Sequence, residues 1–306
     1  MMRDTAIVGA GTVGRALARR LALAGWPIRA LACRSMESAR AAAEFVGQGE
    51  PYDDPAKAAL LGDVVLLTVP DDRIAEVAEG IARWGGFRKG AVVVHASGGR
   101  PAREMIAARE AGAFLASMHP LQTFATPDAA VDALAGAVFA CEGDEEALPA
   151  VRAIVDAVGG RYVPIDGEKK ALYHAGAVMA CNYLVTLVDG AAALFAEAGI
   201  PREEAISALL PLLRGTIANL ERVGLPKALT GPIARGDADT VSLHVKAISE
   251  ERADLLPLYQ GLGLFTIPIA EAKGTLSERD ASRVEQALTR PPRGSGRKRS
   301  RRTSGL

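Results

Sequence analysis

The stretch Thr5-Ala-Ile-Val-Gly-Ala-Gly-Thr-Val-Gly14 sets three glycines directly behind a short apolar run and at the start of a helical pattern. In a strand–turn–helix unit of this kind, Gly9 permits the tight turn, Gly11 lets a pyrophosphate approach the backbone, and Gly14 lets the helix pack closely on the strand. The helix N-terminus then faces the phosphates. A glycine turn with a purely structural role is the alternative interpretation. We predict a dinucleotide site formed by Gly9, Ala10, Gly11, Thr12, Val13 and Gly14.

Strand and helix patterns alternate from residue 5 to residue 165, as they do in α/β proteins. The run Val64–Val69 is apolar throughout, which is typical of a strand in a parallel sheet that is covered on both faces. We therefore expect a doubly wound Rossmann domain over residues 1–165. Its expected strands are Thr5–Val8, Ile28–Cys33, Val64–Val69, Ala91–His95, Phe114–Met118, Ala137–Cys141 and Arg161–Ile165. Its expected helices are Thr12–Ala24, Met36–Val46, Asp72–Arg83, Pro101–Ala111 and Glu145–Val158.

The strand signals stop after Asp166, and only helical spacing continues. A long helix is expected from Gly167 or Glu168 to Ala198. We predict that residues 166–289 form an all-α domain that serves substrate binding or dimerisation.

Charge is unevenly distributed along the chain, although 36 basic and 36 acidic residues give a formal net charge of zero. Residues 290–306 carry seven basic residues and no acid, so the remainder has 29 basic against 36 acidic residues, a net charge of −7. An acidic body argues against a nucleic-acid partner. Residues 290–306 also lack apolar periodicity, which predicts a disordered basic tail, with an electrostatic arm as the alternative.

Cysteine usage and hydropathy favour a cytoplasmic protein. Cys33, Cys141 and Cys181 form no Cys-x-x-Cys pair, which predicts neither a disulfide scaffold nor a metal site. The first strand begins at Thr5 and leaves no room for a signal peptide. The longest apolar run, Ala175–Val188, is too short to cross a bilayer, so no membrane partner is expected.

The end of the second expected strand indicates which dinucleotide would bind. Arg34 lies about twenty residues beyond the glycine motif, where NAD-preferring enzymes place an acid on the ribose 2′-hydroxyl. A cation followed by the hydroxyl of Ser35 suits a 2′-phosphate, so we predict NADP; an ordinary exposed arginine is the alternative. The remaining candidate cofactor residues are Val69, Pro70 and Ser97.

Histidines follow two strands at the sheet edge where such domains bind their ligands. His119 is a candidate acid/base, and a strand-end hydrogen bond is an equally acceptable role for it. For His95 the structural role is favoured. On the long helix, His174 and Asn182 lie eight residues apart, so both could face one cleft. These two side chains are candidates to orient a substrate or nicotinamide, or they could pair with a neighbouring helix.

Several motifs together resemble a known family. They are Gly9-x-Gly-x-x-Gly14, Val69-Pro-Asp71, His95-x-Ser-Gly98, His119-Pro-Leu-Gln-Thr-Phe124, Tyr173-His174, Asn182 and Thr230-Gly-Pro-x-x-Arg-Gly-Asp237. The chain is similar, over about residues 4–288, to an uncharacterised bacterial family that joins a Rossmann-like NADP-binding domain to a C-terminal helical domain of unknown function.

More distant similarity links the layout to pyrroline-5-carboxylate reductase, ketopantoate reductase, prephenate dehydrogenase and 6-phosphogluconate dehydrogenase. The resemblance implies a helical domain like the C-terminal domain of 6-phosphogluconate dehydrogenase. It also matches Asn182 to the asparagine in the Lys-x-x-x-Asn motif of the β-hydroxyacid dehydrogenases, and Val178 stands where that motif has its lysine.

The expected function is that of an NADP-dependent oxidoreductase that moves a hydride to or from a small carbonyl, hydroxyl or imine compound. His119 would exchange the proton, while His174 and Asn182 would orient the reactants. A non-catalytic dinucleotide-binding sensor or structural protein is the alternative. An Ala-rich helical domain further favours a homodimer.

Overall fold

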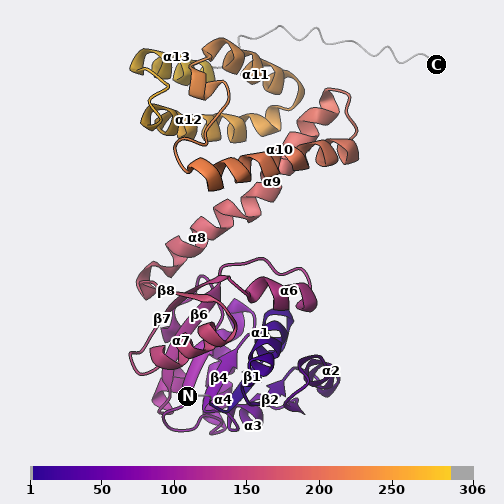
Figure 1. Cartoon of the computed structure of the whole chain (residues 1–306), viewed down its shortest axis with the longest axis vertical. Coiled ribbons are helices and arrows are strands. Elements are labelled where there is room, and N and C mark those ends of the chain that lie inside the picture. The colour runs from indigo at the N-terminus through magenta and orange to yellow at the C-terminus, as the bar shows by residue number, and fades with distance from the viewer. Residues whose placement is uncertain (1–2, 291–306) are drawn as a thin grey trace, which may run out of the picture. The chain divides into compact units, whose positions relative to one another are not determined.

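The computed structural model describes residues 3–290 (Figure 1). The chain divides into two compact units, the first ending at Cys181 and the second beginning at Asn182. The domain boundary expected at residue 165 coincides with the end of the sheet. The first unit continues beyond the sheet to Cys181, through the helix that begins at Lys170. The predicted tail, apart from Arg290, lies outside the described residues.

The first unit is built on one eight-stranded sheet of order β3-β2-β1-β4-β5-β6-β7-β8. All neighbouring strands are parallel except β6 and β7, which are antiparallel. The strands are β1 Thr5–Val8, β2 Ile28–Ala32, β3 Glu50–Tyr52, β4 Val64–Leu67, β5 Val92–His95, β6 Phe114–Pro120, β7 Val138–Gly143 and β8 Arg161–Pro164. The helices are α1 Thr12–Leu23, α2 Met36–Val46, α3 Pro55–Ala59, α4 Ile74–Arg83, α5 Ile106–Glu110, α6 Pro127–Leu134, α7 Leu148–Ala157 and α8 Lys170–Ala180.

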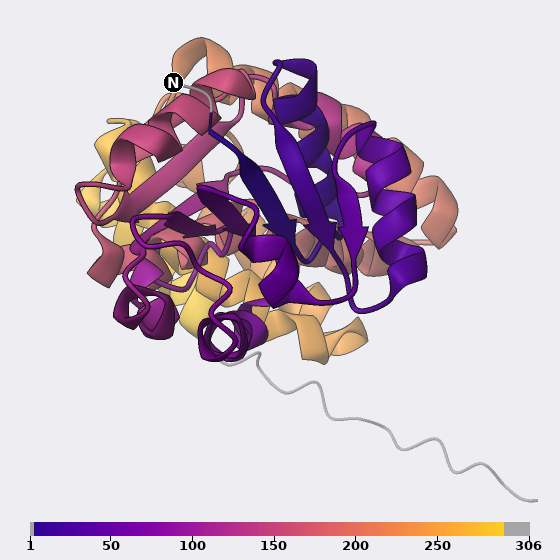
Figure 2. The ribbon, with the colours of Figure 1, turned by 90° about the horizontal axis from the view of Figure 1, so that it is seen from below.

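Both faces of this sheet are covered, as the apolar strands predicted. Alternate residues of each strand point to opposite faces, so Ile7 and Leu66 belong to one core layer while Ala6 and Val65 belong to the other. Helices α1, α2 and α7 supply the first layer, and α3 and α4 the second. Figure 2 shows the N-terminal strands side by side. The predicted doubly wound architecture is confirmed, with β7 and β8 running opposite to the other six strands.

Three elements of the first unit were missing from the sequence prediction. Strand β3 has only three residues, and its central Pro51 is tolerated because β3 is the edge strand beside β2. Helix α3 has five residues and is signalled only by the Asp54 N-cap and by Pro55 at its first position. Helix α6 lies in the connection that reverses the chain from β6 to β7. That reversal is why the sheet is not parallel throughout.

The second unit is helical within the described residues, as expected. Its helices are α9 Asn182–Glu197, α10 Arg202–Val223, α11 Ala238–Glu251, α12 Leu256–Ala272 and α13 Glu278–Thr289. The expected single long helix is divided at Cys181, where α8 ends and α9 begins. The combined segment Gly167–Glu197 is nevertheless long and apolar enough to cross a membrane by length and composition, which corrects the expectation that no run would suffice. Within the structure described, 6% of its most apolar window is buried.

Gly14 provides a test of the packing between α1 and β4. A Cβ at this position would overlap Thr68 Oγ1 and lie 2.9 Å from the Gly9 carbonyl oxygen, which is backbone and cannot move aside cheaply. We expect Gly14→Ala to lower the free energy of unfolding by about 1–3 kcal/mol, measured by urea denaturation.

Gly80 in α4 is the matched control, because no atom of the described chain lies within 4 Å of its added Cβ. Gly80→Ala should raise stability by about 0.5–1 kcal/mol. An equal response of the two variants would contradict close packing at Gly14.

Candidate functional site

The glycine turn between β1 and α1 leaves space that the protein itself does not fill. Gly9 has a φ of 87°, and its carbonyl oxygen accepts a 2.9 Å hydrogen bond from Thr68 Oγ1. A Cβ at Gly11 would approach no described atom closer than the Gly9 oxygen at 4.0 Å. Packing therefore explains the glycine at position 14 but not the one at position 11. The missing side chain at Gly11 fits close approach of a ligand.

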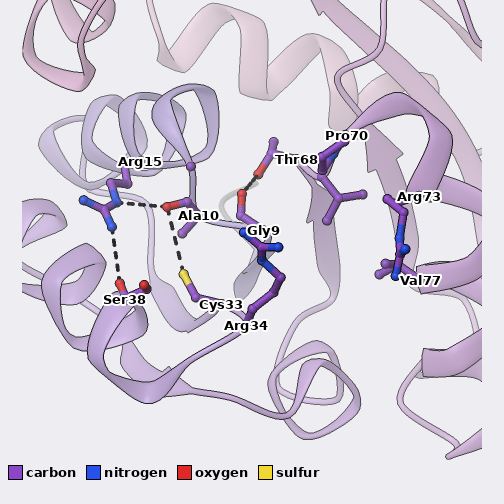
Figure 3. Close-up of a pocket in the computed structure, with 12 residues that line it drawn as sticks. Gly9, Ala10, Arg15, Cys33, Arg34, Ser38, Thr68, Pro70, Arg73 and Val77 are labelled. Atoms are coloured by element: carbon purple, nitrogen blue, oxygen red, sulfur yellow. Dashed lines mark hydrogen bonds between the residues drawn. The ribbon is translucent and has the colours of Figure 1, made fainter.

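A cavity of about 510 Å³ opens over this turn (Figure 3). It contains six of the residues that the sequence predicted to bind the cofactor. The residues that line it are Gly9, Ala10, Gly11, Arg15, Cys33, Arg34, Ser38, Thr68, Val69, Pro70, Arg73 and Val77.

Five other predicted cofactor residues do not line this cavity. Gly14 packs against Thr68, and Ser35 caps α2 by accepting from the Ser38 amide at 3.3 Å. Ser97 donates to Asp71 Oδ2 at 2.6 Å, and Thr12 and Val13 belong to the first turn of α1. Their contact with a cofactor stays a prediction.

Three arginines give the cavity a positive lining, and its described lining includes no acid. Arg15 is held by backbone carbonyls, with Nε 2.9 Å from the Ala10 oxygen and Nη2 3.3 Å from the Ser38 oxygen. Arg73 pairs with Glu76 at 2.8 Å. Arg34 has no ion pair within residues 3–290. The cavity therefore suits an anionic ligand, and Arg34 is the cation most able to reorient toward it (Figure 3).

The sequence analysis missed Arg15 and Arg73. The signal for Arg15 was its place one residue after the last glycine of the motif. Arg73 could have been identified because it lies three residues after Pro70, and Val69 and Pro70 were already candidate cofactor residues.

A second group of polar side chains gathers where β5, β6 and α8 meet. His119, near the end of β6, shares a 2.9 Å hydrogen bond between its Nδ1 and the Tyr173 hydroxyl. Its ring centroid lies 5.8 Å from that of His174. A Cβ on Gly98 would lie 2.5 Å from His174 Nδ1 and 2.8 Å from His119 Nε2. Two imidazole nitrogens thus converge on one glycine of the loop after β5.

The protonation of this group follows from its burial. Burial, with smaller contributions from Lys170 and His174, lowers the pKa of His119 to about 4. Burial raises the pKa of Tyr173. At neutral pH both groups are neutral, so the Tyr173 hydroxyl can donate to Nδ1 of a His119 ring that carries its proton on Nε2. In that tautomer the Nε2 proton lies against Gly98.

His95 has the structural role that the sequence favoured. It is buried at the end of β5, and its Nδ1 accepts from the Ser97 amide at 3.1 Å. Burial lowers its pKa to about 4, although the Pro101 carbonyl opposes this. Nε2 makes no hydrogen bond of good geometry within the described chain. His95 therefore shapes the loop that carries Ser97 and Gly98.

Lys170 was not singled out by the sequence analysis. It opens α8, is fully buried, and donates from Nζ to Ser117 Oγ at 2.5 Å. Burial lowers its pKa. The signal was its helical spacing, because Lys170, Tyr173 and His174 follow an i, i+3, i+4 pattern.

Two further predictions concern Asn182 and metals. Asn182 begins α9 in the second unit, so its role beside His174 stays a prediction. Across residues 3–290, no three His, Cys, Asp or Glu side chains are grouped so that they could hold a metal ion.

Comparison with protein families agrees with this two-part organisation. Residues 2–120 match the Rossmann-like domain, and residues 137–266 match a domain of unknown function, DUF2520. The chain joins a Rossmann-like domain to a DUF2520 domain. The resemblance inferred from the motifs is therefore confirmed. No curated protein matched the sequence.

Solved structures with the same fold include two at more than 25% identity. A protein from Bacteroides fragilis, described as a putative NADP oxidoreductase, is 26% identical with a TM-score of 0.69, over 87% of this chain and 98% of its own. A Thermotoga maritima protein is 28% identical with a TM-score of 0.70, over 88% and 99%. A reductive aminase from Aspergillus terreus in complex with NADPH shares the fold at 20% identity and a TM-score of 0.60, over 93% and 99%.

The convergence on Gly98 can be tested by filling its space. We expect Gly98→Ala to lower the free energy of unfolding by about 1–3 kcal/mol, because the new methyl group would overlap the rings of His119 and His174. Neither ring moves aside freely, since His174 belongs to α8 and His119 is hydrogen-bonded to Tyr173. Urea denaturation provides the measurement.

Gly99→Ala is the control, since its Cβ would meet His174 at an ordinary 3.6 Å. Its stability should stay within about 0.5 kcal/mol of the parent. If Gly98→Ala were equally harmless, the two imidazoles would not be held against the loop.

Proposed function

We propose that this protein is an NADP-dependent oxidoreductase. The observation that carries the proposal is the cavity over the glycine turn, where Gly11 is open and Arg15, Arg34 and Arg73 line the wall without an acid. A dinucleotide brings a pyrophosphate to such a turn, and a 2′-phosphate is favoured by cations where an acid would repel it. The description of the Bacteroides fragilis protein as a putative NADP oxidoreductase supports the same assignment.

The glycine turn, from Gly9 to Gly14, would hold the pyrophosphate, and Arg34 would hold the 2′-phosphate. Bound NADPH supplies a hydride, and the protein supplies orientation and a proton. His119 would donate its Nε2 proton to the substrate oxygen or nitrogen. Its Nδ1 would then take the proton of the Tyr173 hydroxyl, so that the ring stays neutral throughout. Tyr173 is partly exposed and can recover a proton from water.

The substrate class that fits this chemistry is a small carbonyl or imine compound, or the matching alcohol or amine in the reverse direction. His174 and Asn182 would orient it. A non-catalytic dinucleotide sensor would have no use for a polar pocket beside the nicotinamide. The hydrogen-bonded Tyr173–His119 pair therefore favours the enzyme over the sensor.

Helix α10 supports a homodimer as the working form. Apolar side chains recur along it with the 4-3-4-3 spacing of a helix-pairing seam, at Ile206, Leu210, Leu213, Ile217 and Leu220. The most exposed of these five are Leu210 at 43%, Ile217 at 49% and Leu220 at 42%. A second copy of the same helix is the occupant that this spacing fits. With three free cysteines, we propose the cytoplasm as the compartment.

Cofactor titration tests the proposed function. The parent protein should bind NADPH at least tenfold more tightly than NADH, a difference of about 1.4 kcal/mol, as measured by nucleotide fluorescence. Arg34→Asp should reverse the order, because a carboxylate repels the 2′-phosphate and accepts from the ribose hydroxyl. Equal affinities of the parent for the two nucleotides would exclude this role for Arg34.

Gly11→Ala extends this experiment. We expect it to lower the affinity for both nucleotides at least tenfold and to leave the melting temperature unchanged. The added Cβ would enter the cavity where the ligand would bind and would not crowd the protein itself. Gly80→Ala is the control that should alter neither affinity. If Gly11→Ala bound both nucleotides as tightly as the parent protein does, the nucleotide would not bind at this turn.

Sedimentation tests the dimer. The parent should sediment with twice the chain mass of 31.9 kDa, and Ile217→Glu should sediment as a monomer, since burying a charge in an apolar seam is costly. Leu243→Glu on α11 is the control, because Leu243 is 67% exposed and lies off the seam. A dimer that survives Ile217→Glu would place the interface elsewhere.

A further inference from the structure

Lys170 is the only buried Lys, Arg, Asp or Glu residue in the part of the chain that the structure describes. Its neighbour Lys169 shows that the start of α8 can present a lysine to solvent, since that side chain is 73% exposed. Removing an ammonium group from water is costly unless a partner compensates. Within residues 3–290 no carboxylate lies at ion-pair distance from Lys170, and Ser117 is its hydrogen-bond partner. Its burial therefore calls for a reason other than stability.

The position of Lys170 ties α8 to β6 at two points. Lys170, Tyr173 and His174 lie on one face of α8, since residues three and four apart are neighbours on a helix. Ser117 and His119 lie on one face of β6, since alternate strand residues point the same way. The bond from Lys170 to Ser117 measures 2.5 Å, and the bond between Tyr173 and His119 measures 2.9 Å. Together they fix the register of the helix against the strand.

We propose that Lys170 is a positioning residue of the His119 site, which holds α8 in register through Ser117 and keeps a positive charge behind the His119 ring. The inference rests on the proposed function, in which His119 must remain neutral to accept from Tyr173 while it donates from Nε2. A second proton on the ring would break that hydrogen bond and end the relay. The charge of Lys170 disfavours that second proton.

The other groups around His119 are consistent with this role. On α8, His174 acts in the same direction as Lys170, whereas Asp71 of the short helix after β4 favours the protonated ring. Tyr173 is the hydrogen-bond partner. Lys170 also lowers the pKa of His95 on β5. One buried charge therefore acts on both strand-end histidines.

The acidic groups near Lys170 lie on other elements. Glu142 and Cys141 of β7, with Asp71, favour its charged form. Glu142 Oε1 is engaged by the Ala102 amide at 2.7 Å. Burial raises the pKa of the Cys141 thiol to about 12, so that this group stays neutral. Lys170 thus has two carboxylates nearby that favour its charged form, and neither pairs with it.

Titration of the histidines by NMR, in the protein without cofactor or substrate, tests the proposal. Lys170→Met keeps the shape of the side chain and removes its charge. We expect the variant to raise the pKa of His119 by at least one unit, a tenfold gain in proton affinity, and to raise that of His95 in the same direction. His244 of the second unit is the internal reference and should not move.

Ser117→Ala is the matched control, because it removes the hydrogen bond and keeps the charge. The pKa of His119 should change by less than half a unit in this variant, while the Tyr173 ring signals broaden as the helix register loosens. An unchanged pKa of His119 in Lys170→Met would overturn the proposal and would show that Lys170 only fills space in the packing between α8 and β6.

If Lys170→Met does not fold, the Nζ chemical shift of Lys170 in the parent decides, since a neutral amine at pH 7 would equally overturn the proposal. Neither measurement depends on NADPH binding or turnover. A failure of the proposed reductase function would therefore be seen separately.

Discussion

The close approach of α1 to β4 at Gly14 is the constraint on which the rest of the first unit depends. Thr68 fills the space that a side chain at Gly14 would need, and its hydroxyl donates to the Gly9 carbonyl. The same three residues therefore set the helix on the sheet and fix the turn beneath the cavity. Because the turn is held by its own packing, the amide groups at the start of α1 are positioned before any ligand arrives.

Both candidate sites of the first unit arise at the carboxyl ends of its strands, but they differ in electrostatic character. The cavity over the turn is lined by guanidinium groups and suits a permanent anion. In the group around His119, burial keeps the imidazole of His119 and the hydroxyl of Tyr173 neutral. A dinucleotide requires the first environment at its phosphates and a proton-exchanging reactant requires the second.

The sequence predicted what local pattern and spacing can determine. The alternation of apolar strands with amphipathic helices was enough to predict the doubly wound domain. The glycine spacing was enough to predict the turn between β1 and α1. The reversed direction of β7 and β8 was not predictable, because the residue pattern of a strand is the same in either direction. Lys170 was missed for a related reason, since its spacing to Tyr173 and His174 is readable while its burial depends on the strand that α8 meets. Arg34 could be predicted because it lies at a known offset from the glycine motif, whereas the positions of Arg15 and Arg73 next to predicted cofactor residues do not show whether their side chains turn toward the cavity.

His174 presents a buried ring nitrogen that has no hydrogen-bond partner in residues 3–290. An unmet polar atom of this kind leaves the ligand-free protein less stable by about 1–3 kcal/mol than one in which the atom is satisfied. A compound that supplies the missing group recovers this free energy in addition to its other contacts. Compounds that donate to or accept from His174 should therefore raise the melting temperature of the protein more than compounds of equal size that do not. A thermal-shift screen of small carbonyl and imine compounds would use that difference to find the reactant, with no assay for turnover needed.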